Sequence, residues 1–332
     1  MKSYSGLFGR IAAPGTLDAA VDRAARGKHE RLRVQRFLAD RAANVERLSN
    51  EIRCGEYRPR PYTQFGVLDP KPRLISCADF RDRVVHHAVC AVLAPLIDRR
   101  LIDDNYACRI GKGSHRALLR AQLLARRHGW FLKTDIRRYY DSVDHAILLG
   151  KLGRLCREPA LQSLLATLIE HPIPGQAAGK GLPIGNLTSQ WFANFYLDEM
   201  DHWLKEARRI PGYLRYMDDI ACWADDKDQL FALAADLRVF LAERLGLQLK
   251  EERTQVAPVS EGMPFLGWRV HPGVLRQQGQ RLRRQRRLLA RREAAYLRGE
   301  LGARQLQDCV RAISGPRRFL GYGAAIRSVI DV

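Results

Sequence analysis

The sequence predicts an α+β protein in which a small sheet of short apolar strands is set among helices. Two features predict the sheet: a compact apolar run at Trp130–Ile136, and a pair of apolar arms at Gly212–Trp223 that flank two adjacent acids. A third feature predicts the helices, because apolar residues recur at helical intervals over long stretches before, between and after these strands. Strand, helices, hairpin and helix together make an α+β core, with helical pieces before and after it.

The part of the chain before the sheet is predicted to be mostly helical. Residues 1–56 carry apolar side chains at helical intervals among charges, and the prolines between Tyr57 and Pro61 end that pattern. Short strands at 65–68 and 73–76 and a helix over 79–97 are then expected.

The part from Trp130 onward is predicted to combine strands and helices. Asp141 or Ser142 is expected to cap the helix after the first strand, and residues 172–183 form a Pro/Gly-rich connector. The remaining expected elements are helices over 158–170, 186–209 and 227–245, a second hairpin over 264–271, and a basic helical region from about residue 275.

The composition indicates a polyanionic partner and a reducing compartment. The 332 residues carry a formal net charge of +20, and a field of this size favours nucleic acid. An anionic membrane surface is a weaker alternative, because we find no lipidation signal and no apolar run long enough to span a bilayer. The seven cysteines are odd in number and show no Cys-x-x-Cys spacing, which argues against disulfides and zinc. We therefore expect a cytoplasmic protein that binds no membrane.

Arginines crowd the end of the sequence. Between Arg276 and Arg298 they interleave with leucines and alanines, so a helix would bury an apolar stripe and present guanidinium groups outward. Guanidinium pairs bidentately with phosphate, which makes this face a candidate nucleic-acid surface. The alternative is a merely solvated helix face. The candidate residues are Arg283, Arg284, Arg286, Arg287 and Arg291.

Three acids form the candidate catalytic group. Asp135 lies at the end of the first strand, and Asp218 and Asp219 lie between the arms of the hairpin. Nucleotidyl transfer uses two divalent cations about 3.5–4 Å apart, and hard cations bind carboxylate oxygens. Like charges this close raise each other's pKa unless cations neutralise them. An isolated Asp-Asp pair would instead indicate an ordinary turn, since aspartate is common in turns.

The segment Tyr216-Met-Asp-Asp219 resembles the active-site hairpin of reverse transcriptases, and other blocks of that family occur in the same order. These blocks are Lys71–Ser76 with Asp79–Arg83, Tyr106–His115, Phe131–Tyr140, Gly181–Gln190 and Phe265–Gly267. The resemblance covers about residues 57–275 and implies a right-hand polymerase fold of fingers, palm and thumb. The implied parts are a helical N-terminal extension over 1–56, fingers over 57–128, a palm over 129–275 with a fingers insertion around 150–182, and a helical basic thumb over 276–332.

The resemblance also implies roles for single residues. Asp135, Asp218 and Asp219, with the main-chain carbonyl of Ile136, would ligate two Mg²⁺ ions, for which Mn²⁺ can substitute. Phe265, Leu266 and Gly267 would form the primer grip. The residues implied on the side of the incoming dNTP are Arg73 and Lys71 for the triphosphate, Arg109 for nucleotide or template, Tyr140 as a gate against the ribose 2′-hydroxyl, and Ile184 and Gln190. For these positions strand-edge charge, surface ion pairing and core packing are the plainer alternatives.

Two residues of the Gly181–Gln190 block narrow the family. Most reverse transcriptases carry Gln where this chain has Ile184, and Pro where it has Gln190. The form Ile-Gly-x-x-x-Ser-Gln resembles the enzymes of diversity-generating retroelements, which copy a template-repeat RNA with errors opposite adenine. An aliphatic side chain cannot hydrogen-bond the nucleotide, and about 1.4 kcal/mol changes selectivity tenfold. The partners implied are a structured template RNA, the primer with its cDNA, and a small basic accessory protein.

Three other functions stay open. An antiphage-defence reverse transcriptase is the first alternative, which a chain of this short length also fits, although the Gly181–Gln190 block favours the diversity-generating family. An inactive relative would serve as an RNA-binding scaffold, although the presence of all three acids argues against it. A polymerase that makes RNA is disfavoured by the predicted gate at Tyr140.

Overall fold

The computed structural model describes residues 4–68 and 72–319, without the side chains of 280, 281 and 314–319. Contacts divide the chain into two compact units. The first contains residues 1–108, 136–209 and 235–250, and the second contains 109–135, 210–234 and 251–332. The predicted boundaries of fingers, palm and thumb are a different division of the chain and stay a prediction. The mixture of helices and small antiparallel sheets confirms the α+β class.

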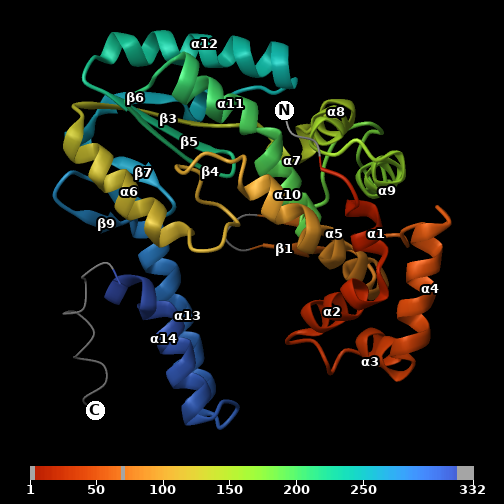
Figure 1. Ribbon diagram of the computed structural model, residues 1–332. Helices are drawn as coiled ribbons and strands as arrows, with labels where there is room; N and C mark the ends of the chain where they lie inside the picture. Colours follow the sequence, from red (N-terminus) through yellow and green to blue (C-terminus); the bar gives the residue numbers. More distant parts are fainter. Residues whose placement is uncertain (1–3, 69–71, 320–332) are drawn as a thin grey trace. The chain divides into compact units, whose positions relative to one another are not determined.

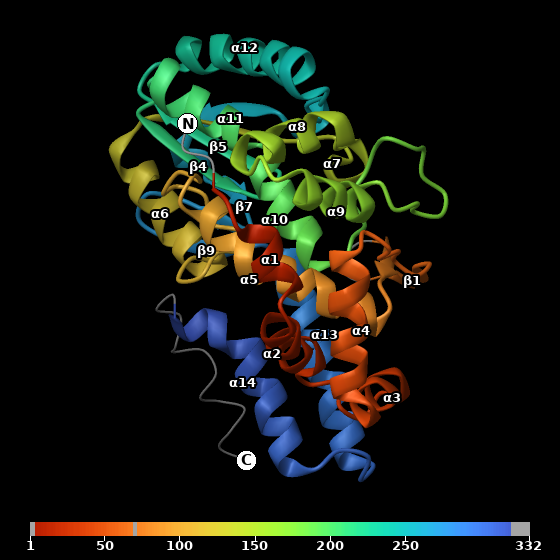
Figure 2. The ribbon, with the colours of Figure 1, turned by 45° about the vertical axis from the view of Figure 1, so that its right-hand side comes forward.

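The first unit is built around helix α5 (Phe80–Asp98), whose residues are mostly buried. The N-terminal helices lie beside it in both views (Figures 1 and 2). The carboxylate of Asp79 caps α5, since it accepts a hydrogen bond from the main-chain N–H of Arg81 at 3.2 Å. The helices that precede α5 confirm the predicted helical region and pack on it or on one another. They are α1 (Leu7–Ala12), α2 (Pro14–Ala25), α3 (Leu32–Ala39) and α4 (Arg41–Arg53).

The first unit also contains the predicted hairpin and a run of shorter helices. Strands β1 (Thr63–Val67) and β2 (Arg73–Cys77) pair antiparallel, with Phe65 opposite Ile75. Helix α10 packs on α5. The helices are α7 (Tyr139–Ser142), α8 (His145–Leu155), α9 (Pro159–Ile169), α10 (Leu187–Tyr196), α11 (Asp198–His202) and the π-helical turn η1 (Trp203–Ala207).

Two predictions about these helices are wrong. The region 186–209 is not one helix, because Leu197 leaves the α-helical conformation and separates α10 from α11. Neither Asp141 nor Ser142 caps α8, the longer helix after the first strand, because both lie inside the short α7. The cap of α8 is Asp144, whose carboxylate accepts a hydrogen bond from the main-chain N–H of Ile147 at 3.1 Å.

The second unit contains a four-stranded antiparallel sheet in the order β4-β5-β3-β6. The apolar strands were predicted, whereas the edge strand β6 was not. Helix α6 packs on β4, and α12 (Lys227–Leu245) follows β5 and continues into residues of the first unit. The bounds of the elements are α6 (Ser114–Arg127), β3 (Trp130–Asp135), β4 (Gly212–Tyr216), β5 (Asp219–Ala224) and β6 (Gln255–Pro258).

A second sheet and two basic helices complete the second unit. The strands β7 (Met263–Phe265), β8 (Trp268–Val270) and β9 (Leu275–Gln277) form an antiparallel meander, so the predicted hairpin gains a third strand. Helices α13 (Gly279–Leu297) and α14 (Ala303–Phe319) lie side by side in both views (Figures 1 and 2). Over the described part of the chain, every helix is too short or too polar to span a membrane.

Candidate active site

Strand pairing in the second unit brings the three predicted catalytic acids together. Asp135 is the last residue of β3 and Asp219 is the first residue of β5, and these two are register partners. Asp218 lies in the turn that joins β4 to β5. Acids that are 83 and 84 positions apart in the sequence therefore meet at one end of the sheet.

The turn that carries Asp218 has a methionine where glycine or asparagine is usual, and a buried arginine hydrogen-bonds to its main chain. Tyr216 and Asp219 close the turn, and Met217 takes a left-handed φ of 59°, which two-residue hairpin turns require and which glycine or asparagine usually supplies. Arg215 is completely buried, and its Nη1 donates a hydrogen bond to the main-chain oxygen of Met217 at 2.9 Å. Arg215 thus fixes the carbonyl of a strained residue next to the acids.

Burial and the neighbouring acids raise the pKa of Asp218. Burial raises the pKa of Asp218 to about 7, and the Asp135 carboxylate, which shares a hydrogen bond with it, acts in the same direction, as does Asp219. A hydrogen bond from the main chain of the turn opposes the shift. The Asp218 carboxyl therefore lies where burial and two neighbouring acids disfavour its negative charge.

Lys133 supplies positive charge to the third acid, a role that the sequence analysis missed. Lys133 precedes Asp135 by two residues and therefore lies on the same face of β3. Its ammonium group is buried, pairs with the carboxylate of Asp219, and donates to the main-chain oxygen of Thr134 at 3.0 Å. A lysine inside an otherwise apolar strand is the signal that could have revealed this residue.

The donor groups suit a divalent cation in kind, but they are not gathered in one cluster. Reverse transcriptases generally use divalent metals, and carboxylate oxygens are the ligands that hard cations prefer. Within the described residues, no three His, Cys, Asp or Glu side chains group closely enough to hold a metal ion. Asp135 and Asp218 converge, whereas Asp219 turns to Lys133. Ile136 belongs to the first unit, where it forms an isolated bridge with Leu249.

Main-chain hydrogen bonds in the first unit join the predicted nucleotide-side residues. The carbonyl of Tyr140 accepts a hydrogen bond from the N–H of Leu182 at 2.7 Å, and the carbonyl of Ile184 accepts one from the N–H of Ser76 at 2.9 Å. Tyr140, Ile184 and strand β2, which begins with the exposed Arg73, therefore belong to one hydrogen-bonded group. Gln190 is half-buried in α10.

Gly185 makes this connection possible. Its φ of 114° lies in the region that favours glycine, and a Cβ there would stand 2.7 Å from Cγ2 of Ile75 on β2. A side chain at position 185 would therefore push the loop away from β2 and break the hydrogen bond between Ile184 and Ser76. Glycine at this position is required by its positive φ and by the close approach of the Ile75 side chain.

The remaining predicted site residues are dispersed. Leu266 and Gly267 form the turn between β7 and β8, with φ of 47° and 80°, and Phe265 is buried beside them. Arg109 is half-buried in the second unit, and Lys71 lies outside the described residues. The five candidate arginines of α13 are all exposed, at positions 283, 284, 286, 287 and 291.

The sequence matches a known family over most of this region. Residues 68–270 match the model of the family described as reverse transcriptase (RNA-dependent DNA polymerase). The protein YkfC of Escherichia coli strain K12 is 25% identical over 273 residues, which cover 69% of this chain and 71% of that protein. The group II intron-encoded protein LtrA of Lactococcus lactis subsp. cremoris is 20% identical over 298 residues, which cover 68% of this chain and 49% of that protein.

Solved structures show the same fold. Apo telomerase from Candida tropicalis superposes with a TM-score of 0.51 at 12% identity, over 66% of this chain and 49% of that one. Telomerase from Candida albicans in complex with a TWJ fragment of telomeric RNA superposes with a TM-score of 0.50 at 10% identity, over 80% and 56% of the two chains. The chain thus spans about half the length of LtrA and of these telomerases.

These findings agree with the geometry of the acids. The matched segment contains β3, the β4–β5 hairpin and all three acids, and it is more than half of the 332 residues. The chain therefore belongs to the reverse transcriptase family, whose activity is RNA-directed DNA polymerisation.

Proposed function

We propose that this chain copies an RNA template into DNA, with Asp135, Asp218 and Asp219 as the ligands of two Mg²⁺ ions. The observation that carries the proposal is the pairing of Asp135 with Asp219 across β3 and β5, with Asp218 in the adjacent turn. When bound, the ions supply Lewis acidity for the attacking 3′ oxygen and for the departing pyrophosphate. Mn²⁺ can take the same ligands.

Other residues of the chain support the acids and bind the incoming nucleotide. Arg215 holds the turn so that Asp218 and Asp219 keep their positions, and Lys133 neutralises Asp219 until a stronger cation takes that carboxylate. Arg73, helped by Lys71, attracts the triphosphate of the incoming dNTP. The ring of Tyr140 closes the space that a ribose 2′-hydroxyl would need.

Primer extension on a defined RNA template tests the proposed reaction. The chain should add dNTPs in the presence of Mg²⁺ and should discriminate strongly against rNTPs. Tyr140→Ala should relax that discrimination while leaving dNTP addition measurable. Extension with rNTPs at the same rate by the unchanged chain would contradict the proposed gate, and no extension with either substrate would move the proposal toward an RNA-binding scaffold.

We further propose that the enzyme belongs to a diversity-generating retroelement and copies a template-repeat RNA with errors opposite adenine. The support is the aliphatic Ile184 beside Gly185, in a loop bonded through its main chain to β2, together with Gln190 in α10. Ile184 has no group that can hydrogen-bond a nucleotide, so base-pair geometry is checked less strictly there. Its partners in this role are a structured RNA and a small basic accessory protein.

The error spectrum of the cDNA tests this assignment. Ile184→Gln restores a hydrogen-bonding side chain and should lower misincorporation opposite adenine several-fold, with errors opposite the other bases changed less. Ile184→Leu is the matched control, because it keeps the aliphatic character and should keep the error rate. Accurate extension by the unchanged chain would instead favour an antiphage-defence role.

A further inference from the structure

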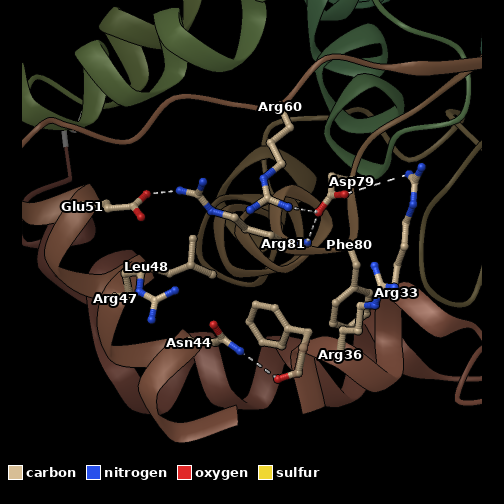
Figure 3. A pocket seen from close by; sticks show the side chains of 11 residues that line it. Arg33, Arg36, Asn44, Arg47, Leu48, Glu51, Arg60, Asp79, Phe80 and Arg81 are labelled. Atoms are coloured by element: carbon tan, nitrogen blue, oxygen red, sulfur yellow. Dashed lines mark hydrogen bonds and ion pairs between the residues drawn. The ribbon is translucent and has the colours of Figure 1, made fainter. Parts of the chain in front are cut away.

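The N-terminal helices contain a cavity that the proposed reaction does not use. It lies in the first unit between α3, α4, the segment before β1 and the start of α5, and its volume is about 400 Å³ (Figure 3). Its lining is dominated by arginines that come from four separate stretches of the chain. They are Arg33, Arg36, Arg47, Arg60 and Arg81.

The cavity holds more positive than negative groups. Its two carboxylates are Glu51, which pairs with Arg81, and Asp79, which lies 3.5 Å from Arg60 and 3.9 Å from Arg33 (Figure 3). Among the described residues, Arg36 and Arg47 have no carboxylate partner, and both are exposed. The carboxylates of the cavity are therefore already engaged, and two guanidinium groups are available to an external anion.

Four of the five arginines lie on helices that pack against one another. Phe37 and Phe80 are buried beneath them, with ring centroids 5.2 Å apart in an edge-to-face arrangement. The side-chain amide of Asn44 donates to the main-chain oxygen of Phe37 at 3.0 Å and ties α4 to α3. Burial lowers the pKa of Arg81, and the guanidinium of Arg47 acts in the same direction, against the carboxylate of Asp82. The helices that carry most of these arginines are thus packed together around a positive cavity.

Phosphate is the anion that this geometry fits. The planar guanidinium group presents paired N–H donors that match two phosphate oxygens, and several such groups around one cavity form a binding site for an anion. A cavity of about 400 Å³ accepts a single nucleotide rather than the broad face of a duplex. RNA is the phosphate-bearing partner that we infer, because the chain belongs to a family whose members copy RNA.

We propose that this arginine-lined cavity binds the phosphate groups of a single-stranded RNA, outside the site where nucleotides are added. The residues involved lie before or at the start of α5 and include none of the acids or nucleotide-side residues named above. The cavity gives residues 1–56, whose role the sequence left open, a function in holding RNA.

Equilibrium binding of RNA tests the proposal. The full chain is titrated into a 20-nucleotide single-stranded RNA carrying a 3′ fluorophore, without dNTPs, and anisotropy is recorded over a series of salt concentrations. The test variant is Arg36→Gln with Arg47→Gln. The matched control is Arg26→Gln with Arg53→Gln, which removes the same charge from exposed positions of the same unit outside the cavity. Thermal unfolding by circular dichroism monitors the fold of both variants.

We expect the test variant to raise the Kd about tenfold, which corresponds to two lost charge-assisted contacts, and the control to change it less than twofold. The slope of log K against log salt should become shallower by about 1.4, since each phosphate contact on a single strand contributes about 0.7. If the test variant unfolds earlier than the control, Arg36→Lys with Arg47→Lys replaces it; this variant keeps the charge but lacks the paired N–H donors, so it should raise the Kd about threefold, and an unchanged Kd would count against the cavity.

Three results would overturn the proposal. Equal loss of affinity in the test and control variants would show an effect of net charge alone. Unchanged affinity in the test variant would remove the cavity from RNA binding. Displacement of the RNA by polyglutamate at equal charge concentration would assign the cavity to an acidic protein. The assay contains no dNTP, so its outcome is independent of whether the chain polymerises.

Discussion

Two regions of this molecule concentrate charge of one sign, and they do so in different ways. At the β4–β5 turn, three half-buried acids meet, and burial together with the neighbouring carboxylates raises the pKa of Asp218 to about 7. In the cavity of the N-terminal helices, five arginines meet, and four of them are exposed to solvent. Water screens the exposed arginines more than it screens the half-buried acids, which depend more on their neighbours.

The two regions therefore depend on different residues to balance their charge. The acidic turn depends on internal cations: Lys133 pairs with Asp219, and the buried Arg215 holds the carbonyl of Met217. The arginine cavity needs only partial neutralisation by Glu51 and Asp79. We therefore expect substitutions of charged residues to be severe at the turn and mild at the cavity.

Arg215→Leu should have the largest effect on stability. The substitution leaves the Met217 carbonyl without its buried donor and removes a completely buried guanidinium, so we expect a loss of about 3 kcal/mol in the free energy of unfolding. Urea unfolding measures this loss, and Arg36→Gln is the control, expected to change stability by less than about 0.5 kcal/mol. Equal losses in the free energy of unfolding would contradict the expected difference between buried and exposed arginines.

Lys133→Met should have a smaller effect that depends on metal. Without the ammonium group, Asp219 loses its cation, and we expect the metal-free protein to lose about 2 kcal/mol of stability. Mg²⁺ should then raise the Tm of the variant more than that of the unchanged chain, because the ion replaces a missing charge. Thermal unfolding with EDTA or with Mg²⁺ measures both values. An identical Mg²⁺-induced shift in the two proteins would contradict the role given to Lys133.

Substitution of His86 should have a smaller effect on stability, which appears only as a changed dependence on pH. Burial in α5 lowers the pKa of His86 to about 3, with His87, His171 and Arg83 acting in the same direction, so the folded protein keeps this imidazole neutral. Its contribution to stability is complete above the unfolded pKa of about 6.5 and is lost as the pH falls toward 3, by up to about 1.4 kcal/mol per pH unit.

Urea unfolding between pH 7 and pH 5 checks this dependence. His86→Leu removes the titrating group, so its stability should fall less with decreasing pH than that of the unchanged chain. The exposed His29 provides the matched control, and His29→Leu should leave the dependence unchanged. Parallel pH dependences of the His86 variant and the unchanged chain would show that His86 does not titrate on unfolding.

The strands that carry the acids could be predicted from the sequence because their signal is local. Apolar runs that end on acids predicted β3 and the β4–β5 hairpin, and the helical periodicity predicted α5, α9 and α12. The cap of α8 was misplaced, because Asp141, Ser142 and Asp144 are all good capping residues and only the short α7 decides among them. The break at Leu197 has no local signal either, since apolar residues continue through it.

The residues that support the site could not be predicted because their partners are distant in the sequence. Lys133 meets Asp219 only through the register of β3 with β5. The position of Ile184 beside β2 depends on a hydrogen bond to Ser76 across more than a hundred residues. The arginine cavity combines residues from α3, α4, α5 and the segment before β1, and none of those stretches is distinctive by itself.

The central claim, that the acids at the β4–β5 turn bind the metal ions of a reverse transcriptase, is tested most directly by Asp218→Asn. Single-nucleotide extension of a primer on an RNA template with Mg²⁺ is compared among the unchanged chain, Asp218→Asn and Asp226→Asn, an exposed acid shortly after β5. We predict that Asp218→Asn loses at least about a thousandfold in rate, several kcal/mol of transition-state stabilisation, while Asp226→Asn stays within about twofold. Extension by Asp218→Asn at a rate close to that of Asp226→Asn would contradict the assignment of the active site.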